Sequence, residues 1–208
     1  MNKLSIQILA FSAFIIIAVA ALYYGGVFGN SNQQAPSIVS ERTAQKVNIL
    51  KYSDYSCPAC KVFIAAQEQL KADFGDLVEI EYRYFPLESF PHSRLASHAV
   101  EAAKRQGKFK EMHDLVFEYQ AEWSPRQADA MGYFTRFAED IDLDMGQFMA
   151  DLDSDAVRAV VESQLQEGIR RTVNATPTFF IDGHKLRQNP QSYEQFKAIV
   201  ELYMYRSN

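Results

Sequence analysis

The longest apolar run of the chain lies at its N-terminus. After Lys3 no charged residue occurs until Glu41, and residues 4–28 are mostly apolar. About 20 such residues are enough for a helix to cross the hydrocarbon core of a bilayer. A positive charge in front of the run, with none closely behind it, favours a cytoplasmic N-terminus. The pattern predicts a cytoplasmic segment 1–3, a transmembrane signal anchor 4–28 and an exported remainder.

A cleaved signal peptide is the competing interpretation of this run. Ala18-Val19-Ala20 resembles a cleavage motif, but the apolar run continues past it and exceeds the roughly 7–15 residues usual for a signal peptide. Residues 29–43 carry turn-forming residues without apolar periodicity, which predicts a flexible linker. Both interpretations export the domain at 44–208.

The exported domain opens with a pattern typical of a strand–helix–strand unit. Residues 47–52 are rich in β-forming residues, and residues 77–85 alternate between apolar and polar as a second strand. Between them, Pro58 stands where helices accept proline, at the first helical position, and apolar residues follow at helical spacing. We expect strand, helix and strand in this order.

A long helical stretch follows the second strand. Apolar spacing and capping signals predict helices at 92–105, 109–120, from Ser124 onward, at 144–152 and at 154–173. The chain then returns to a strand at 178–181, a hairpin turn at Asp182-Gly183 and a closing helix at 192–205. This order predicts an α/β domain with a helical insertion over about residues 90–173.

Charge and composition narrow the possible functions. The formal net charge is −5 and no Lys/Arg-rich stripe occurs, so nucleic-acid binding is not predicted. The histidines are scattered without the spacing of metal ligands, so no metal site is predicted. These histidines are His92, His98, His113 and His184.

The chain has only two cysteines, Cys57 and Cys60. A bridge that closes so short a loop removes little entropy from the unfolded chain, so a purely structural disulfide is not expected. The unpaired N–H groups and the dipole at a helix N-terminus stabilise an anion, which lowers the pKa of the Cys57 thiol and makes its thiolate a good nucleophile and leaving group. Cys60, one turn further in, is predicted to be the resolving thiol. The alternative is a pair of incidental buried cysteines.

Two stretches of the chain resemble the DsbA-like thiol:disulfide oxidoreductases of the thioredoxin superfamily. They are Tyr-Ser-Asp-Tyr-Ser-Cys-Pro-Ala-Cys at 52–60 and Ala-Thr-Pro-Thr-Phe-Phe-Ile-Asp-Gly at 175–183. Shorter likenesses at 82–87 and 107–114 lie between them, so the resemblance covers about residues 44–205. It implies a thioredoxin fold interrupted by a helical domain, with a redox-active Cys57–Cys60 disulfide and no other cofactor.

The resemblance also implies a cis peptide bond before Pro177, beside the disulfide. The backbone of Thr176 would then pair with an extended substrate segment, as in β-strand addition. A trans proline that simply begins a strand is the physical alternative. Pro58 and Ala59 are expected to tune the redox potential, but this dipeptide is typical neither of thioredoxins nor of the best-known strong oxidants.

One position departs from the family pattern. An acidic residue usually lies six positions before the first cysteine, where this chain has Lys51. The family often places a lysine opposite that acid on the following strand, where this chain has Glu81. We predict a buried, charge-swapped Lys51–Glu81 pair, in which the cation favours thiolate and a desolvated lysine can itself carry protons. A lysine that points to solvent from a strand edge is the alternative.

Together these features predict a thiol:disulfide oxidoreductase held on the cytoplasmic (inner) membrane, with its catalytic domain in the periplasm or outside the cell. Exported proteins with cysteines are the expected substrates, and a membrane oxidase of the quinone-reducing type is the expected redox partner. Disulfide formation is the favoured activity. A reductase or isomerase with the same site, a non-catalytic binding module for unfolded chains and a peroxidase are the alternatives.

Overall fold

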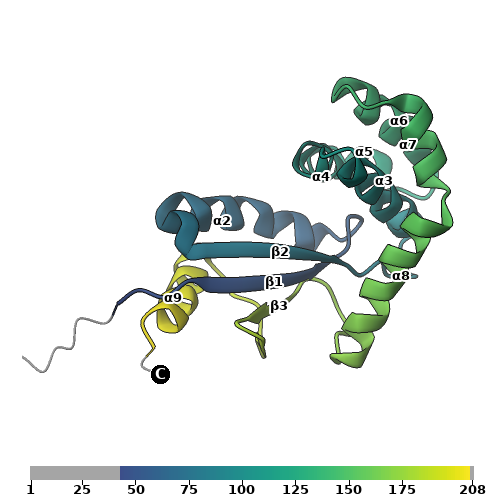
Figure 1. Ribbon diagram of the computed structural model, residues 1–208. Coiled ribbons are helices and arrows are strands. Elements are labelled where there is room, and N and C mark those ends of the chain that lie inside the picture. The colour runs from purple at the N-terminus through teal and green to yellow at the C-terminus, as the bar shows by residue number, and fades with distance from the viewer. Residues whose placement is uncertain (1–42, 207–208) are drawn as a thin grey trace, which may run out of the picture. The chain divides into compact units, whose positions relative to one another are not determined.

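The computed structural model describes residues 43–206 (Figure 1). The predicted anchor at 4–28, and all but the last residue of the predicted linker at 29–43, lie outside the described residues. Among the helices of residues 43–206, none combines the length and the apolar character that crossing a bilayer requires.

A mixed four-stranded sheet forms the centre of the domain. Its strand order is β2-β1-β3-β4, with β1 at Val47–Ser53, β2 at Val78–Tyr84, β3 at Thr178–Ile181 and β4 at His184–Lys185. The strand β1 pairs in parallel with β2 and antiparallel with β3. A parallel pair needs a crossover connection, which the helix α2 at Pro58–Phe74 supplies. The predicted strand–helix–strand unit is therefore confirmed.

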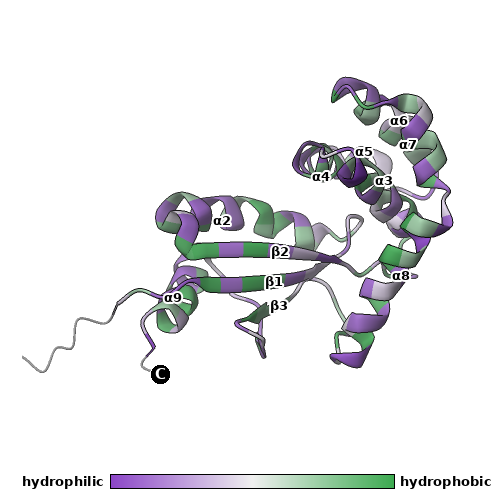
Figure 2. Ribbon diagram, in the orientation of Figure 1, coloured by the Kyte–Doolittle hydropathy of each residue, from purple (hydrophilic) through white to green (hydrophobic). Residues whose placement is uncertain are grey.

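Side chains of β1 alternate between two cores on opposite faces of the sheet. Val47 and Ile49 pack with α2 and with the closing helix α9 at Tyr193–Met204. Tyr52 packs on the other face with Phe85 and with residues of β3 and α8. Along β1 and β2, Figure 2 shows hydrophobic colour interrupted by hydrophilic positions, as this alternation requires.

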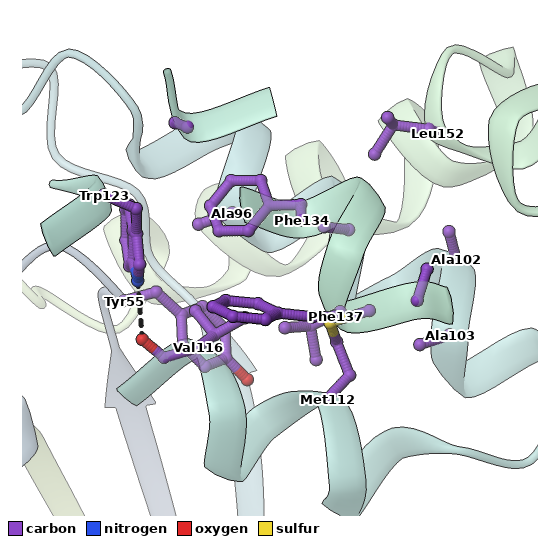
Figure 3. Close-up of a cluster of buried hydrophobic side chains, with 14 of the residues drawn as sticks. Tyr55, Ala96, Ala102, Ala103, Met112, Val116, Trp123, Phe134, Phe137 and Leu152 are labelled. Atoms are coloured by element: carbon purple, nitrogen blue, oxygen red, sulfur yellow. Dashed lines mark hydrogen bonds between the residues drawn. The ribbon is translucent and has the colours of Figure 1, made fainter. Parts of the chain in front are cut away.

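Six helices occupy the stretch for which the sequence predicts an insertion. They are α3 at Ser93–Arg105, α4 at Phe109–Glu118, α5 at Gln120–Trp123, α6 at Ala130–Asp140, α7 at Met145–Leu152 and α8 at Asp155–Arg170. They gather beyond the carboxyl ends of β1 and β2 (Figure 1). Their aromatic core includes Trp123, Phe134 and Phe137, and Tyr55, from the turn before α2, reaches into it (Figure 3). The insertion and the start of α2 thus share one core.

The predicted helix start at Ser124 is wrong. Ser124 is the C-terminal cap of α5, and the next helix begins at Ala130. Pro125 lies in a turn instead, where its carbonyl oxygen accepts a hydrogen bond from Ala128 N at 2.9 Å. The side chain of Asp129 caps α6 by accepting from Gly132 N at 2.9 Å. A Ser-Pro pair starts turns as readily as helices, and the later aspartate, an equally good cap residue, is the one that begins the helix.

Candidate active site

The two cysteines lie at the first turn of α2. Cys57 is the N-cap residue and Pro58 follows at the first helical position, as predicted. Cys60 N donates to Cys57 O at 3.0 Å and closes the turn. Both cysteines are free thiols, so this is the reduced form of the pair. Pro58 and Ala59 are exposed, whereas Cys57 is only 7% exposed and Cys60 is fully buried. Of the two sulfurs, Cys57 is the one that a substrate can reach.

Hydrogen bonding and burial shift the pKa values of the two thiols in opposite directions. A hydrogen bond from the Cys60 side chain is the main reason why the pKa of Cys57 falls to about 5, and hydrogen bonds from Thr176 and from the backbone of Cys60 and Ala59 add to it against the cost of burial. Burial, followed by the same bond to Cys57, raises the pKa of Cys60 far above that of an ordinary thiol. Near neutral pH the reduced pair is therefore a Cys57 thiolate beside a Cys60 thiol.

The loop before β3 brings Thr176 and Pro177 to the cysteines. The Thr176–Pro177 peptide bond is cis, as the resemblance implies. In its thiol form, Cys57 donates from Sγ to Thr176 O at 3.4 Å. The Thr176 hydroxyl is buried and has no geometric hydrogen-bond partner in the described part of the chain, so it is free to donate to a thiolate. Asn189 Nδ2 donates to Pro177 O at 2.8 Å and holds this loop in place.

Lys51 lies fully buried next to the cysteine turn. Its Nζ donates to Cys60 O at 3.1 Å and to Gln67 Oε1 at 2.9 Å. It also lies 5.5 Å from the ring centre of Phe117 and 5.8 Å from that of Tyr82. Burial lowers the pKa of Lys51 to about 8, although attraction to Cys60 and Cys57 opposes the change. The alternative of a lysine pointing to solvent is therefore wrong.

The predicted Lys51–Glu81 pair is also wrong. In the parallel register Glu81 lies opposite Leu50, whereas Lys51 lies opposite Tyr82. Because side chains alternate along a strand, Lys51 and Glu81 point to opposite faces of the sheet. The half-exposed side chain of Glu81 instead forms an ion pair with Arg83 at 3.1 Å. Lys51 has only neutral hydrogen-bond partners within residues 43–206.

Asp54 is a buried residue of the site that the sequence analysis missed. Its carboxylate accepts from Ser56 N at 2.8 Å, from Leu87 N at 2.7 Å and from Ser93 Oγ at 2.6 Å. These bonds tie the cysteine turn to the segment after β2 and to the first residue of α3. Burial raises the pKa of Asp54 to about 6, despite these three hydrogen bonds. An aspartate between a strand and a helix is a signal for such local bonding, and it could have been used.

Two residues of the insertion also hold the cysteine turn. Gln120 Nε2 donates to Tyr55 O at 2.6 Å and to Cys57 O at 3.0 Å. The Tyr55 hydroxyl is hydrogen-bonded to His113 Nδ1 at 2.8 Å, and both side chains are buried. These contacts join distant positions of the chain, so no local pattern in the sequence announces them. They make the helical insertion part of the site.

A helix-capping Cys-Pro-Ala-Cys turn beside a cis-proline, on a mixed sheet with a helical insertion, defines a DsbA-like thiol:disulfide oxidoreductase. The chain belongs to the thioredoxin family, because the family model described as Thioredoxin matches residues 36–202. The family and the fold that the resemblance implied are thereby confirmed.

Solved structures of this class share the fold at low sequence identity. A thioredoxin-like oxidoreductase from Silicibacter pomeroyi DSS-3 is 23% identical with a TM-score of 0.65, and the match covers 79% of this chain and 90% of that one. Oxidised BdbD from Bacillus subtilis is 22% identical with a TM-score of 0.67, and the match covers 76% of this chain and 87% of that one. At these identities the likeness establishes the fold.

A second set of relatives is much longer than this chain. The Na(+)/H(+) antiporter NhaA of Herminiimonas arsenicoxydans is 34% identical over 142 residues, which are 68% of this chain and 22% of the antiporter. NhaA 3 of Salinispora tropica is 33% identical over 155 residues, which are 74% of this chain and 22% of that protein. The chain spans about a fifth of the length of these relatives, so the transport that their names describe is not carried over to it.

Proposed function

We propose that this protein forms disulfide bonds in exported proteins by thiol–disulfide exchange through Cys57 and Cys60. The observation that carries the proposal is the opposite shift of the two thiols, with the pKa of Cys57 lowered to about 5 and that of Cys60 raised. A stabilised Cys57 thiolate favours the reduced form of the pair, which makes the disulfide a good oxidant.

The geometry supports a division of roles between the cysteines. A substrate thiolate attacks the accessible Cys57 sulfur of the disulfide, and Cys60 leaves and takes up a proton. A second substrate thiolate then attacks the mixed disulfide, and Cys57 leaves as the thiolate that the helix N-terminus and Cys60 stabilise. Thr176 and Pro177, beside Cys57, are proposed to hold the extended substrate segment by backbone pairing.

The equilibrium constant of the pair with glutathione tests the direction of electron flow. Disulfide formation requires a potential well above that of thioredoxin, about −270 mV, and nearer to about −120 mV, the value of a strong oxidant. A value near that of thioredoxin would instead favour the reductase or isomerase alternative. Pro58 and Ala59, exposed between the cysteines, are the proposed tuning positions, and exchanging them should move the potential.

A trapping experiment separates catalysis from mere binding. In Cys60→Ala the mixed disulfide has no resolving thiol within the protein, so exported proteins with cysteines should accumulate on Cys57. Cys57→Ser in the same background is the matched control and should capture none of them. Equal capture by both variants would favour the non-catalytic binding module.

We also propose that residues 4–28 anchor the protein in the cytoplasmic membrane, with the described domain on the outer side. The uncharged apolar run and the charge in front of it support this proposal. A membrane oxidase of the quinone-reducing type is the proposed partner that restores the disulfide. Fractionation at alkaline pH tests the anchor: an anchored chain stays in the membrane pellet, and a cleaved one is released and is shorter by mass spectrometry.

A further inference from the structure

Lys51 is a buried lysine whose hydrogen-bond partners within residues 43–206 include no acidic group. Buried charges in proteins are normally paired, since an unpaired one loses its hydration without compensation. The Nζ of Lys51 is fully enclosed, yet its two hydrogen bonds go to the backbone carbonyl of Cys60 and the side-chain amide of Gln67. Both acceptors are neutral. This arrangement does not commit the side chain to its charged form.

Neutral acceptors allow the amine to change its protonation without breaking the site. A carbonyl or amide oxygen accepts a hydrogen bond from an ammonium and from a neutral amine alike, because both carry N–H donors. A carboxylate in the place of Gln67 would instead hold the proton on Lys51 by charge attraction. The ring centres of Phe117 and Tyr82 lie 5.5 and 5.8 Å from Nζ, close to the limit of about 6 Å for cation–π attraction, so they hold an ammonium only weakly.

Among the groups around Lys51, only the cysteine pair changes its charge with the redox state. From α4, His113 is neutral because burial lowers its pKa to about 3. From β2, Tyr82 is neutral because burial raises its pKa. The strand β3 places Phe179 opposite Lys51 in the sheet register. The carboxylate of Asp54, after β1, is engaged by three donors of its own and, with a pKa of about 6, carries its charge at pH 7. From α2 come Cys57 and Cys60, whose charge depends on their redox state.

We infer that Lys51 stores a proton in step with the redox state of the cysteines: it is a neutral amine beside the Cys57–Cys60 disulfide and an ammonium beside the reduced pair. This inference rests on the proposed function. A substrate dithiol supplies two electrons and two protons as its own disulfide forms. The electrons break the Cys57–Cys60 bond, one proton goes to Cys60 and the other to Lys51, while Cys57 keeps the negative charge. Reoxidation by a disulfide of the partner returns both protons. Lys51 does not touch the substrate; it is a positioning residue that holds a proton beside Cys60.

The pH dependence of the redox equilibrium tests this inference. In the intact protein, reduction should take up close to two protons around pH 7, above the titrations of Cys57 and Asp54 and below that of Lys51. The equilibrium constant for reduction, corrected for the protons of glutathione, should then fall nearly 100-fold per pH unit. In Lys51→Met it should fall 10-fold. Since tenfold corresponds to about 29.6 mV for two electrons, the slopes are about 59 and about 30 mV per pH unit.

Two controls keep this result interpretable. Lys46→Met removes a lysine just before β1 whose exposed Nζ pairs with Glu79 at 2.7 Å, and it should keep the wild-type slope. If Lys51→Met does not fold, the Cε chemical shift of Lys51 can be titrated in the wild-type protein. We expect a lower midpoint in the oxidised form than in the reduced form. Equal midpoints, or equal slopes in the wild type and Lys51→Met, would overturn the inference.

The same titration separates this inference from the proposed function. If the cysteines exchange readily with glutathione but take up one proton per two electrons, the proton-storing role of Lys51 is refuted and the oxidoreductase stands. If Cys57 and Cys60 form no disulfide with glutathione at all, both proposals are refuted.

Discussion

At the scale of single residues, the reactivity of Cys57 depends first on its neighbour Cys60. The hydrogen bond from Cys60 is the largest cause that lowers the pKa of Cys57 to about 5. Cys60→Ala removes this donor, so the midpoint of Cys57 alkylation against pH should rise, while the bonds from Thr176 and the backbone keep it below the ordinary value. Cys60→Ser keeps a donor and should stay nearer to the wild type. Identical midpoints in the alanine and serine variants would contradict this assignment.

Asp54 should matter for stability more than for chemistry. Asp54→Ala leaves a buried and a partly buried N–H group and one buried hydroxyl without their acceptor, at Ser56, Leu87 and Ser93. We expect a loss of about 3 kcal/mol in the free energy of unfolding, measured in urea, and faster hydrogen exchange at the amide of Leu87. An unchanged exchange rate at that amide would show that the carboxylate does not hold the segment after β2.

The contribution of Asp54 to the free energy of unfolding changes with pH in a definite direction. The pKa of Asp54 is raised from about 3.8 to about 6 in the folded protein, so the folded state holds its proton more tightly than the unfolded state does. Its contribution is therefore fully present below about pH 3.8 and is lost as the pH rises through about 6. Asp54→Ala lacks this decline, so the stability difference between wild type and variant should be larger at pH 4 than at pH 7.

At the scale of elements, α8 packs against the sheet through a glycine. A Cβ added at Gly168 would lie 2.7 Å from ring atoms of Phe85 and 3.0 Å from Tyr52 Cδ1. Gly168→Ala should therefore destabilise the fold by about 1–2 kcal/mol, since overpacking exceeds the gain of about 1 kcal/mol in helix propensity. Gly146→Ala in α7 meets only the side chain of Asp144 at 3.3 Å and should be neutral or stabilising. Equal melting temperatures would contradict this packing.

Elements were easier to predict than their contacts. Alternation and helical spacing located β1, α2 and β2, because these signals are local. The pair of Lys51 and Glu81 failed by one position of register, since β2 places Tyr82 and not Glu81 opposite Lys51. Gln120 could not be found from the sequence, because it reaches the cysteine turn through tertiary packing of the insertion. The helix-start pattern therefore located the cysteines, and the family resemblance located the cis-proline loop, but neither identified Asp54 or Gln120.

At the scale of the whole molecule, the redox state of two sulfurs is linked to the stability of the fold. The core that encloses Cys57 and Cys60 continues through the aromatic residues of the helical insertion. Gln120 and His113 connect the same insertion to the cysteine turn. The folded domain as a whole therefore stabilises the negative charge of Cys57, and this stabilisation is lost when the domain unfolds.

In Lys51→Met, where no lysine proton is taken up on reduction, this linkage predicts that the reduced form gains stability over the oxidised form as the pH rises. The pKa of Cys57 is lowered from about 9 to about 5, so its contribution is lost as the pH falls through about 5 and is complete above about 9. In this variant the stability difference, reduced minus oxidised, should grow by about 2 kcal/mol between pH 5 and 8, a value that allows for partial solvation of the thiolate. In the wild-type protein the proton that Lys51 takes up on reduction offsets this growth, so the difference should change little with pH. Loop closure by the disulfide does not depend on pH, so it cancels from this change. Urea unfolding of both forms of Lys51→Met measures the difference, and adding Cys57→Ser to the reduced form should remove the rise. A difference that stays constant with pH in Lys51→Met would mean that the folded domain does not stabilise the Cys57 thiolate, and the case for an oxidant would fail with it.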